Sequence, residues 1–304
     1  MSLNIAAKYF IRNDVKSLLQ KLTGFDLNKI FAPKFNPDLK SSQIQLLTQN
    51  ELHKEKQRSV EKAKYLLQMP PFLAPRDDKK EILSQNESLN PLNMTKSNYM
   101  FIDISMDIPH DKRMIVVRES NGTLRKADHG EKEKMLQVYF PEQGRTNYIP
   151  PMFSSKNLEN CLKMKHYLLI LNKACVKFEP NDSEFIRVTH RVYEFVNEMN
   201  DFEQLRSTRF FGPMVFYLAW YKKLENILAF YLNESNVSDC VDLIKLYSIV
   251  HEKEIKYLKY VNEKTNDLGL IEMFIKHDLN NSARAELALR KIYENQETTK
   301  QVSI

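Results

Sequence analysis

The sequence predicts a mainly α-helical protein of the α+β class, with an N-terminal helical arm, a small antiparallel β-meander in the middle and a C-terminal multi-helix bundle or irregular α-solenoid. Helical periodicity runs through the region after Lys156, and the chain contains only 6 glycines, as is typical of helical proteins with few tight loops. Near the middle, β-rich segments surround Asn121-Gly122, a strong hairpin signal. We therefore expect a helical arm and linker over 1–97, a β-meander with one helix over 98–150, and a helical domain over 151–304.

The start of the chain predicts an N-terminal segment followed by a short helix. Met1 to Asn13 contains basic and apolar residues and no acid, which is typical of an organelle-import segment; a frayed helix start is the alternative. Asp14 or the residue before it then caps a helix that Gly24 ends. Pro33 and Pro37 interrupt the chain after this helix.

A second helix is predicted from Gln49 to about Met69, because Thr48 and Glu51 have the spacing of a capping box. Its surface is densely charged and its apolar stripe is thin. Such a helix either crosses solvent or lies on another molecule. The residues from Pro75 to Ser97 are mostly polar, and they predict a linker.

The middle of the chain predicts three strands, over 98–105, 113–119 and 123–127, because these segments are rich in aromatic and β-branched residues. Three strands are about the minimum for a stable sheet, and one face must then pack on another element. The candidate element is a helix over 131–140. Its side chains expected to face inward are Met135, Leu136, Tyr139 and Phe140.

The predicted hairpin carries an unusual concentration of positive charge. With a two-residue loop, Arg118 lies directly opposite Arg125, and Glu119 lies diagonal to Lys126 and offsets its charge. Two facing arginines indicate a nearby anion: an acid of this chain, an acidic partner protein or a phosphate held by both guanidinium groups, with plain solvation as the remaining alternative. A three-residue loop ending at Gly122 would instead stagger the two arginines.

The C-terminal half predicts a series of long helices. The segment from Met214 to Trp220 is apolar on every side, so its helix is expected to be buried from all directions. The predicted helices cover Lys156 to Phe178, Glu184 to Met199, Pro213 to Asn233, Val237 to Val261 and Ser282 to Gln296.

Two further arginines, Arg206 and Arg209, precede the buried helix and stand beside aromatic residues. Basic groups next to aromatic rings can stack on nucleic-acid bases, although more often the rings belong to the core and the arginines bind carbonyls or acids. The candidate anion or partner contacts of the chain are thus Arg113, Arg118, Arg125, Lys126, Arg206 and Arg209.

The sequence predicts no enzyme. The phosphate-binding glycine loops and the G-x-S-x-G nucleophile motif are absent, and the 7 histidines and 3 cysteines do not fall at metal-ligand spacings. We expect no catalytic residue, no metal, no cofactor and no small-molecule substrate. No apolar run is long enough for a membrane-spanning helix, so no membrane partner is expected either. The cysteines are expected to be buried free thiols in a reducing compartment.

Several stretches of the chain, in their order and spacing, resemble those of the family of the twenty-second small-subunit protein of the mitochondrial ribosome. The resemblance covers roughly Asp14 to Asn295 and is most specific in the middle. The matching stretches are LTGFDLNKIF (22–31), LLTQNEL (46–52), MPPFL (69–73), FIDISMDIPH (101–110), IVVRESNGTLRKA (115–127), QVYFPEQGR (137–145) and LRSTRFFGPMVFY (205–217).

The resemblance implies a non-catalytic structural component of the mitochondrial small subunit, bound to the ribosome in the matrix. Its partners would be other mitochondrial small-subunit ribosomal proteins, with limited contact to small-subunit ribosomal RNA. The family usually has a longer leader, so either import uses Met1 to Asn13 or part of the leader is missing here. The alternative function is a free-standing helical RNA-binding protein acting on organellar transcripts, which a true repeat period would favour.

Overall fold

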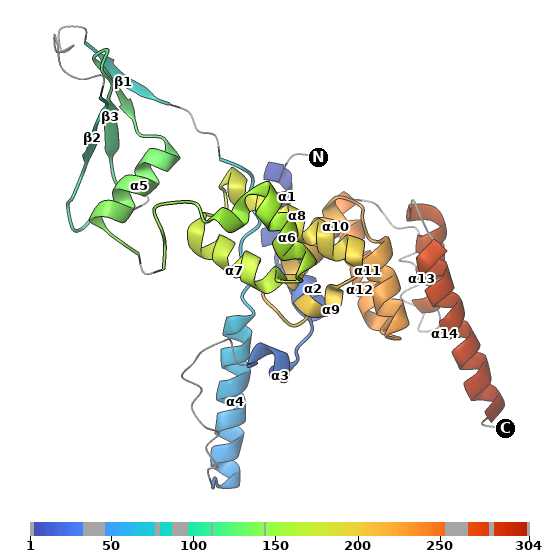
Figure 1. The fold of residues 1–304 in the computed structure, drawn as a ribbon. Helices are drawn as coiled ribbons and strands as arrows, with labels where there is room; N and C mark the ends of the chain where they lie inside the picture. Colours follow the sequence, from blue (N-terminus) through green and yellow to red (C-terminus); the bar gives the residue numbers. More distant parts are fainter. Residues whose placement is uncertain are drawn as a thin grey trace.

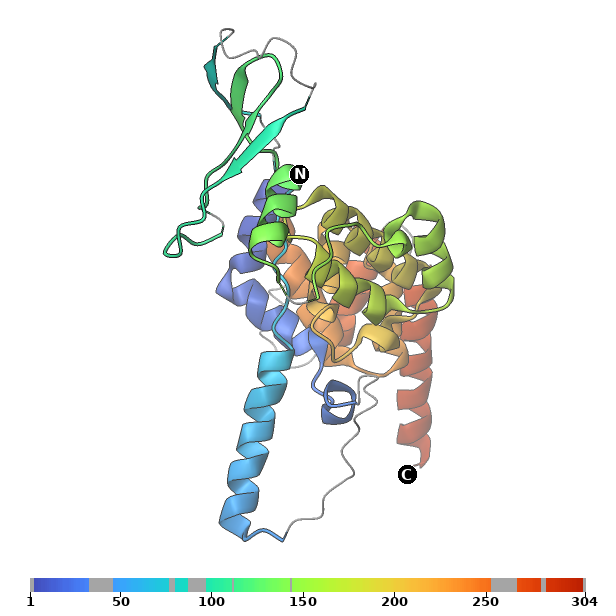
Figure 2. The ribbon, with the colours of Figure 1, turned by 60° about the vertical axis from the view of Figure 1, so that its left-hand side comes forward.

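The computed structural model describes most of the chain and consists of a helical body from which two other parts project. A small sheet with its helix α5 lies at one end of the body, and helix α4 extends away from it in another direction (Figures 1 and 2). The described residues are 3–32, 46–76, 80–86, 97–110, 112–142, 144–252, 267–279 and 283–302, with side chains up to residue 294.

Helices make up most of the described residues. Their bounds are α1 Leu3–Ile11, α2 Asn13–Thr23, α3 Leu27–Ile30, α4 Gln49–Leu66, α5 His129–Tyr139, the 3₁₀ helix η2 Pro151–Phe153, α6 Ser155–Lys163, α7 Tyr167–Lys177, α8 Ser183–Met199, α9 Phe202–Leu205, α10 Phe211–Trp220, α11 Glu225–Asn233, α12 Val237–His251, α13 Asp267–Asp278 and α14 Ala283–Val302. The strands are β1 Ile82–Gln85, β2 Tyr99–Ile102, β3 Ile115–Arg118 and β4 Thr123–Lys126.

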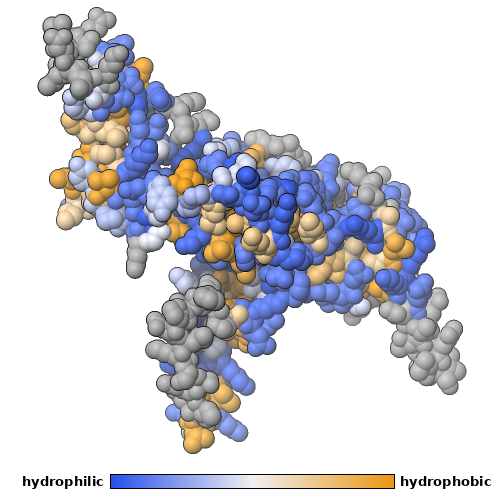
Figure 3. All heavy atoms as spheres, viewed as in Figure 1, coloured by the Kyte–Doolittle hydropathy of each residue, from blue (hydrophilic) through white to orange (hydrophobic). Residues whose placement is uncertain are grey.

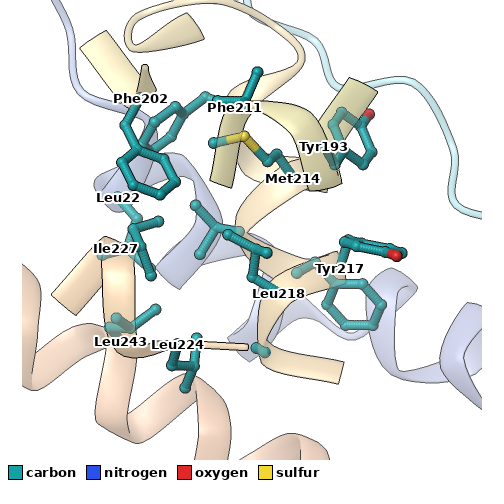
Figure 4. Close-up of a cluster of buried hydrophobic side chains, with 14 of the residues drawn as sticks. Leu22, Tyr193, Phe202, Phe211, Met214, Tyr217, Leu218, Leu224, Ile227 and Leu243 are labelled. Carbon is teal, nitrogen blue, oxygen red and sulfur yellow. The ribbon is translucent and has the colours of Figure 1, made fainter. Parts of the chain in front are cut away.

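Helix α10 lies at the centre of the body. Every residue from Phe211 to Trp220 is buried, as the apolar run in the sequence predicts. Figure 4 shows Met214, Tyr217 and Leu218 of this helix packed among side chains from several other helices. Near the start of α10, the Met69 side chain packs closely against the backbone of Gly212. A Cβ atom at position 212 would lie 2.2 Å from the Met69 sulfur, so a larger residue would displace this contact.

The two N-terminal helices are part of this body. Ala6 and Phe10 of α1 are buried, and the Phe10 ring meets the Phe216 ring edge-on with 5.1 Å between centroids. Helix α2 packs against α10 and α12, and its Leu22 joins the central cluster (Figure 4). Leu3–Ile11 therefore forms a packed helix rather than a frayed start. Gly24 (φ 76°) follows the end of α2, as predicted.

Helix α4 is largely exposed. The predicted capping box is present, with the Thr48 side chain accepting from the backbone N–H of Glu51 and the Glu51 carboxylate accepting in return. Only Ala63 of this helix is buried. The segment after it returns to the body, where Phe72 is buried and stacks on His190 with 5.8 Å between ring centroids.

The four described strands form one antiparallel sheet in the order β1-β4-β3-β2. The three predicted strands and the helix beside them are confirmed. The linker predicted from Pro75 to Ser97 is wrong in part, because Ile82–Gln85 forms the edge strand β1 paired with β4. Tyr139 also differs from expectation, since it is exposed rather than turned inward.

Two predicted long helices are each divided in two. The chain turns between α6 and α7 at Lys165 (φ 59°), and between α10 and α11 at Lys222 (φ 57°). Helix α13 is an addition that the sequence did not predict. Pro33, Pro37 and the last part of the predicted helix that ends at Val261 lie outside the described residues.

Candidate interaction surface on the sheet

The hairpin of β3 and β4 closes through a three-residue loop. The backbone N–H of Gly122 donates to the Glu119 carbonyl (3.1 Å), and the N–H of Glu119 donates to the Thr123 carbonyl (2.9 Å). Gly122 has φ 82°, the left-handed conformation that this loop requires at its last position. The two-residue loop was thus the wrong alternative, and the pairing shifts by one residue.

The shift places the two hairpin arginines on opposite faces. Arg118 pairs with Leu124, and Arg125 pairs with Val117. Since cross-strand partners share a face and successive residues alternate, Arg118 and Arg125 point in opposite directions. The expected like-charge contact is absent from this hairpin.

Arg125 lies on the inner face of the sheet, where it is only 4% exposed. Its Nη1 and Nη2 atoms donate to the two carboxylate oxygens of Glu131 at 2.7 and 2.8 Å, and its Nε donates to Glu119 at 2.7 Å. These bonds lower the pKa of the Glu131 carboxyl to about 2 and raise the pKa of Arg125. Acids of this chain therefore neutralise Arg125, and the pair joins β4 to α5.

Lys126 is paired differently from the prediction. Its Nζ donates to Glu81 at 2.7 Å, next to the edge strand that the sequence did not predict. Glu119, its expected partner, is bound to Arg125 instead. Both groups of the Lys126–Glu81 pair are well exposed, so the pair contributes little to stability.

The outer face of the sheet is the side opposite Arg125. Tyr99 pairs with Arg118, and Phe101 pairs with Val116, which places both rings on this face. Tyr99 and Phe101 are 45% and 55% exposed. We define the outer face by the outward residues of β2, β3 and β4: Tyr99, Phe101, Val116, Arg118, Leu124 and Lys126.

Apolar side chains also gather along the β2 side of the sheet, at the left of Figure 3. Met100 on the edge strand is 39% exposed, and Ile104 and Met106 beyond it are still more exposed. An exposed apolar edge of this kind is usually covered in a functional assembly. The sequence did show Tyr99 and Phe101 two residues apart in a predicted strand. It did not indicate that the face of the sheet that carries them is exposed to solvent.

Arg113 is buried at the end of the sheet. Its Nη1 donates to the carbonyls of Asp103 (2.8 Å) and Ser105 (2.7 Å), and its guanidinium lies 4.0 Å from the Phe140 ring centroid. These contacts connect the loop after β2 to the end of α5.

The two arginines before α10 are bound within the helical body. Arg206 forms ion pairs with Glu234 and Asp239, and Arg209 donates to the Asn172 side chain (2.8 Å) while lying over the Phe210 ring. The structure thus gives partners within the chain to Arg206 and Arg209. As contacts to an anion or a partner, all six candidate residues stay predictions.

The sheet is fixed to the body by ionic contacts. Lys177 of α7 donates to Glu133 of α5 at 2.6 Å and to the Thr146 carbonyl at 2.9 Å. Arg76, just before the sheet, binds Glu179 (2.9 Å) and Asp182 (3.1 Å) of the body. The buried strand residues Ile115 and Val117 lie outside the body's apolar cluster. These described contacts between the sheet region and the body are therefore polar and ionic rather than apolar.

Other kinds of site find little support in the described residues. No group of three or more His, Cys, Asp or Glu side chains there could hold a metal ion. Cys161, Cys175 and Cys240 are free thiols. Only Cys240 is buried, as expected, whereas Cys161 and Cys175 are partly exposed. Among the helices described, none has the length and apolar character needed to cross a membrane. A groove of about 950 Å³ separates α4 from α1 and α2, with Phe25 and Tyr65 in its lining.

A helical body with an exposed helix and a bare, partly basic sheet face is typical of a protein that acts by binding neighbours in an assembly. Comparison with known proteins agrees. A model of the family described as mitochondrial 28S ribosomal protein S22 matches residues 8–252.

Curated relatives include the small ribosomal subunit protein mS22 of Mus musculus, 36% identical over 285 residues, which span 94% of this chain and 79% of the relative. The mS22 protein of Bos taurus is 35% identical over 285 residues, with the same coverage of both chains. The chain belongs to the mitochondrial 28S ribosomal protein S22 family, a family of mitochondrial ribosomal proteins.

Proposed function

We propose that this protein is a non-catalytic structural component of the small subunit of the mitochondrial ribosome, bound to the ribosome in the mitochondrial matrix. It supports mitochondrial translation by contacting other small-subunit proteins and, over a limited area, small-subunit ribosomal RNA. The observation that carries the proposal is the similarity to small-subunit proteins across 94% of the chain.

The shape of the molecule supports a role in assembly. Helix α4 and the sheet project from the body, and each has exposed apolar side chains, Leu52 and Tyr65 on α4 and Phe101 on the sheet. Projecting elements of this kind reach neighbours that the body does not touch. The charged groups described above are mostly paired within the chain, which suits a peripheral protein better than one embedded in RNA.

Sedimentation of a mitochondrial lysate through a sucrose gradient tests the proposal. The protein should migrate with the small subunit, remain there after a high-salt wash that removes loosely bound factors, and move to lighter fractions after ribonuclease digestion. A protein found wholly at the top of the untreated gradient would contradict the proposal and favour a free-standing RNA-binding protein.

A second measurement addresses translation. Depletion of the protein should reduce incorporation of labelled methionine into mitochondrially encoded proteins, together with the amount of assembled small subunit. Unchanged incorporation with a normal level of small subunits would contradict the functional part of the proposal.

A further inference from the structure

We propose that the outer face of the sheet binds single-stranded RNA, with Tyr99 and Phe101 stacking on neighbouring bases and Arg118 contacting a phosphate. This inference rests on the proposed function, because it assigns the limited RNA contact to one defined surface. It differs from the sequence-based expectation, whose six candidate contact residues are all basic and include neither ring.

The two rings have the geometry of a stacking surface. They lie two residues apart on β2, which places their Cα atoms about 6.5–7 Å from each other on the same face. Among the described residues, the ring contacts of the protein involve neither of them, and both rings are about half exposed. RNA-binding sheets present aromatic side chains in this way to two or three successive bases.

Arg118 supplies the charge that single-stranded RNA requires. It is the cross-strand partner of Tyr99, so both residues lie on the outer face, and its guanidinium group reaches toward the hairpin loop. Within the part of the chain that the structure describes, Arg118 forms no ion pair, and its Nη1 donates to the Gly122 carbonyl at 3.1 Å. The remaining N–H groups are thus available to a phosphate oxygen.

Across β2, β3 and β4 the outer face carries positive charge, and the Glu81 carboxylate lies at its β1 side, paired with Lys126. The outward side chains of β2, β3 and β4 include Arg118 and Lys126 and no carboxylate. Lys126 is partly neutralised by Glu81, whereas Arg118 is not. Positive charge on the same face as two exposed rings favours a polyanion with flat bases over an acidic or apolar protein surface.

A strand from a neighbouring protein added to the edge of β2 is the competing occupant. Such a strand would bond to the backbone of β2 and would use apolar side chains without needing flat rings. Leucine in place of both aromatic residues keeps the apolar character and removes the stacking. The two occupants therefore respond differently to the same substitution.

The first experiment measures binding of the full-length protein to a fluorescein-labelled oligouridylate by fluorescence anisotropy. Tyr99→Leu combined with Phe101→Leu should weaken binding by about tenfold or more, since each base–ring stack contributes a factor of about five or greater. Tyr139→Leu with Tyr148→Leu is the matched control, because these rings are also exposed but lie outside the sheet. Failure of the wild-type protein to bind at low salt, or equal losses in both double variants, would overturn the proposal.

The second experiment isolates the charge. Arg118→Gln should weaken binding and reduce the slope of log affinity against log salt by about 0.7, the value for one phosphate contact on a single strand. Arg290→Gln, an exposed arginine on α14, should leave both quantities unchanged. An unaltered slope for Arg118→Gln would exclude the phosphate contact.

Ultraviolet crosslinking of isolated small subunits separates this inference from the proposed function. A nucleotide adduct on the peptide containing Tyr99 and Phe101 supports RNA on the outer face. A protein that sediments with the subunit but carries its crosslink at these rings to another protein overturns the inference and leaves the proposed function intact. Absence of the wild-type protein from the subunit contradicts the proposed function itself.

Discussion

At the scale of single residues, Arg118 and Arg125 differ in burial and in partners although they belong to one hairpin. Arg125 holds the sheet together, because its guanidinium group is buried between Glu119 and Glu131 and satisfies both. Glu131 also completes the capping box of α5 with Asp128, so one carboxylate serves the helix end and the sheet at once. Arg118 leaves its charge on the outer face.

Arg125→Gln should therefore lower the stability of the sheet by about 2–3 kcal/mol, since it removes a buried guanidinium group and leaves the partly buried carboxylates of Glu119 and Glu131 without their partner. Arg118→Gln should change it by less than about 1 kcal/mol. Hydrogen exchange of the amides in β3 and β4 of the purified proteins measures both effects. Equal protection in the two variants would show that the buried pair contributes no more than an exposed charge.

The sequence could predict the hairpin but not the face or the partners of its charged side chains. Asn121-Gly122 indicates a turn in either register, and only the three-residue loop places Arg125 inside. Glu81, the partner of Lys126, immediately precedes the edge strand β1. This strand has little β signal of its own, because Ile82–Gln85 is short, exposed and at the edge of the sheet. Long-range partners such as Glu131 depend on the packing of α5, which local patterns do not contain.

At the scale of elements, four of the body's helices end in a left-handed turn that contains no glycine. Lys165, Asn200, Lys222 and Ser235 each follow a helix with φ between 57° and 60°. The chain after each residue bonds back to the helix, as in the bond from the Lys223 N–H to the Leu218 carbonyl (2.8 Å). This explains why the sequence predicted single long helices where two exist. Glycine is the usual signal for such a stop, whereas a lysine gives none.

Lys222→Gly should stabilise the protein by about 0.5–1 kcal/mol. The left-handed conformation costs a side-chain-bearing residue about 1–2 kcal/mol, and the greater freedom of glycine in the unfolded chain offsets part of that gain. Lys173→Gly, in the exposed middle of α7, is the control and should destabilise by about 1 kcal/mol. Urea unfolding compares the two, and a destabilised Lys222→Gly variant would mean that the lysine side chain makes a favourable contact of its own.

At the scale of the whole molecule, the N-terminal helices and the C-terminal half form one body. The Tyr231 hydroxyl donates to the Leu22 carbonyl at 3.2 Å, and the Ser207 N–H donates to the Thr23 carbonyl at 2.8 Å. The sequence predicted α2 from its cap and apolar spacing but not its place in the body, since periodicity indicates which face is buried and not what covers it. The division at residues 97 and 150 stays a prediction.

Leu22→Ala should lower the free energy of unfolding of the body by about 2–5 kcal/mol, because it opens a cavity between α2 and the C-terminal helices. The fluorescence of Trp220, the single tryptophan, follows the unfolding of the body. Its ring centroid lies 6.3 Å from that of Tyr9 in α1, so it senses the packing of the N-terminal helices. Leu52→Ala on exposed α4 should change stability by about 0.5 kcal/mol or less. A fluorescence midpoint shared by both variants would show that α2 is dispensable for the body.

The contact between Leu22 and Tyr231 also affects the folding rate, because the two residues are 209 positions apart in the sequence. Closing so long a loop costs little additional free energy at equilibrium, but it slows the search for the native topology. Helices α1 and α2 emerge early from the synthesising ribosome and their partners α10 and α12 emerge much later. Until α10 and α12 are synthesised, the apolar sides of α1 and α2 stay exposed. We therefore expect chaperones to bind the incomplete chain during this time.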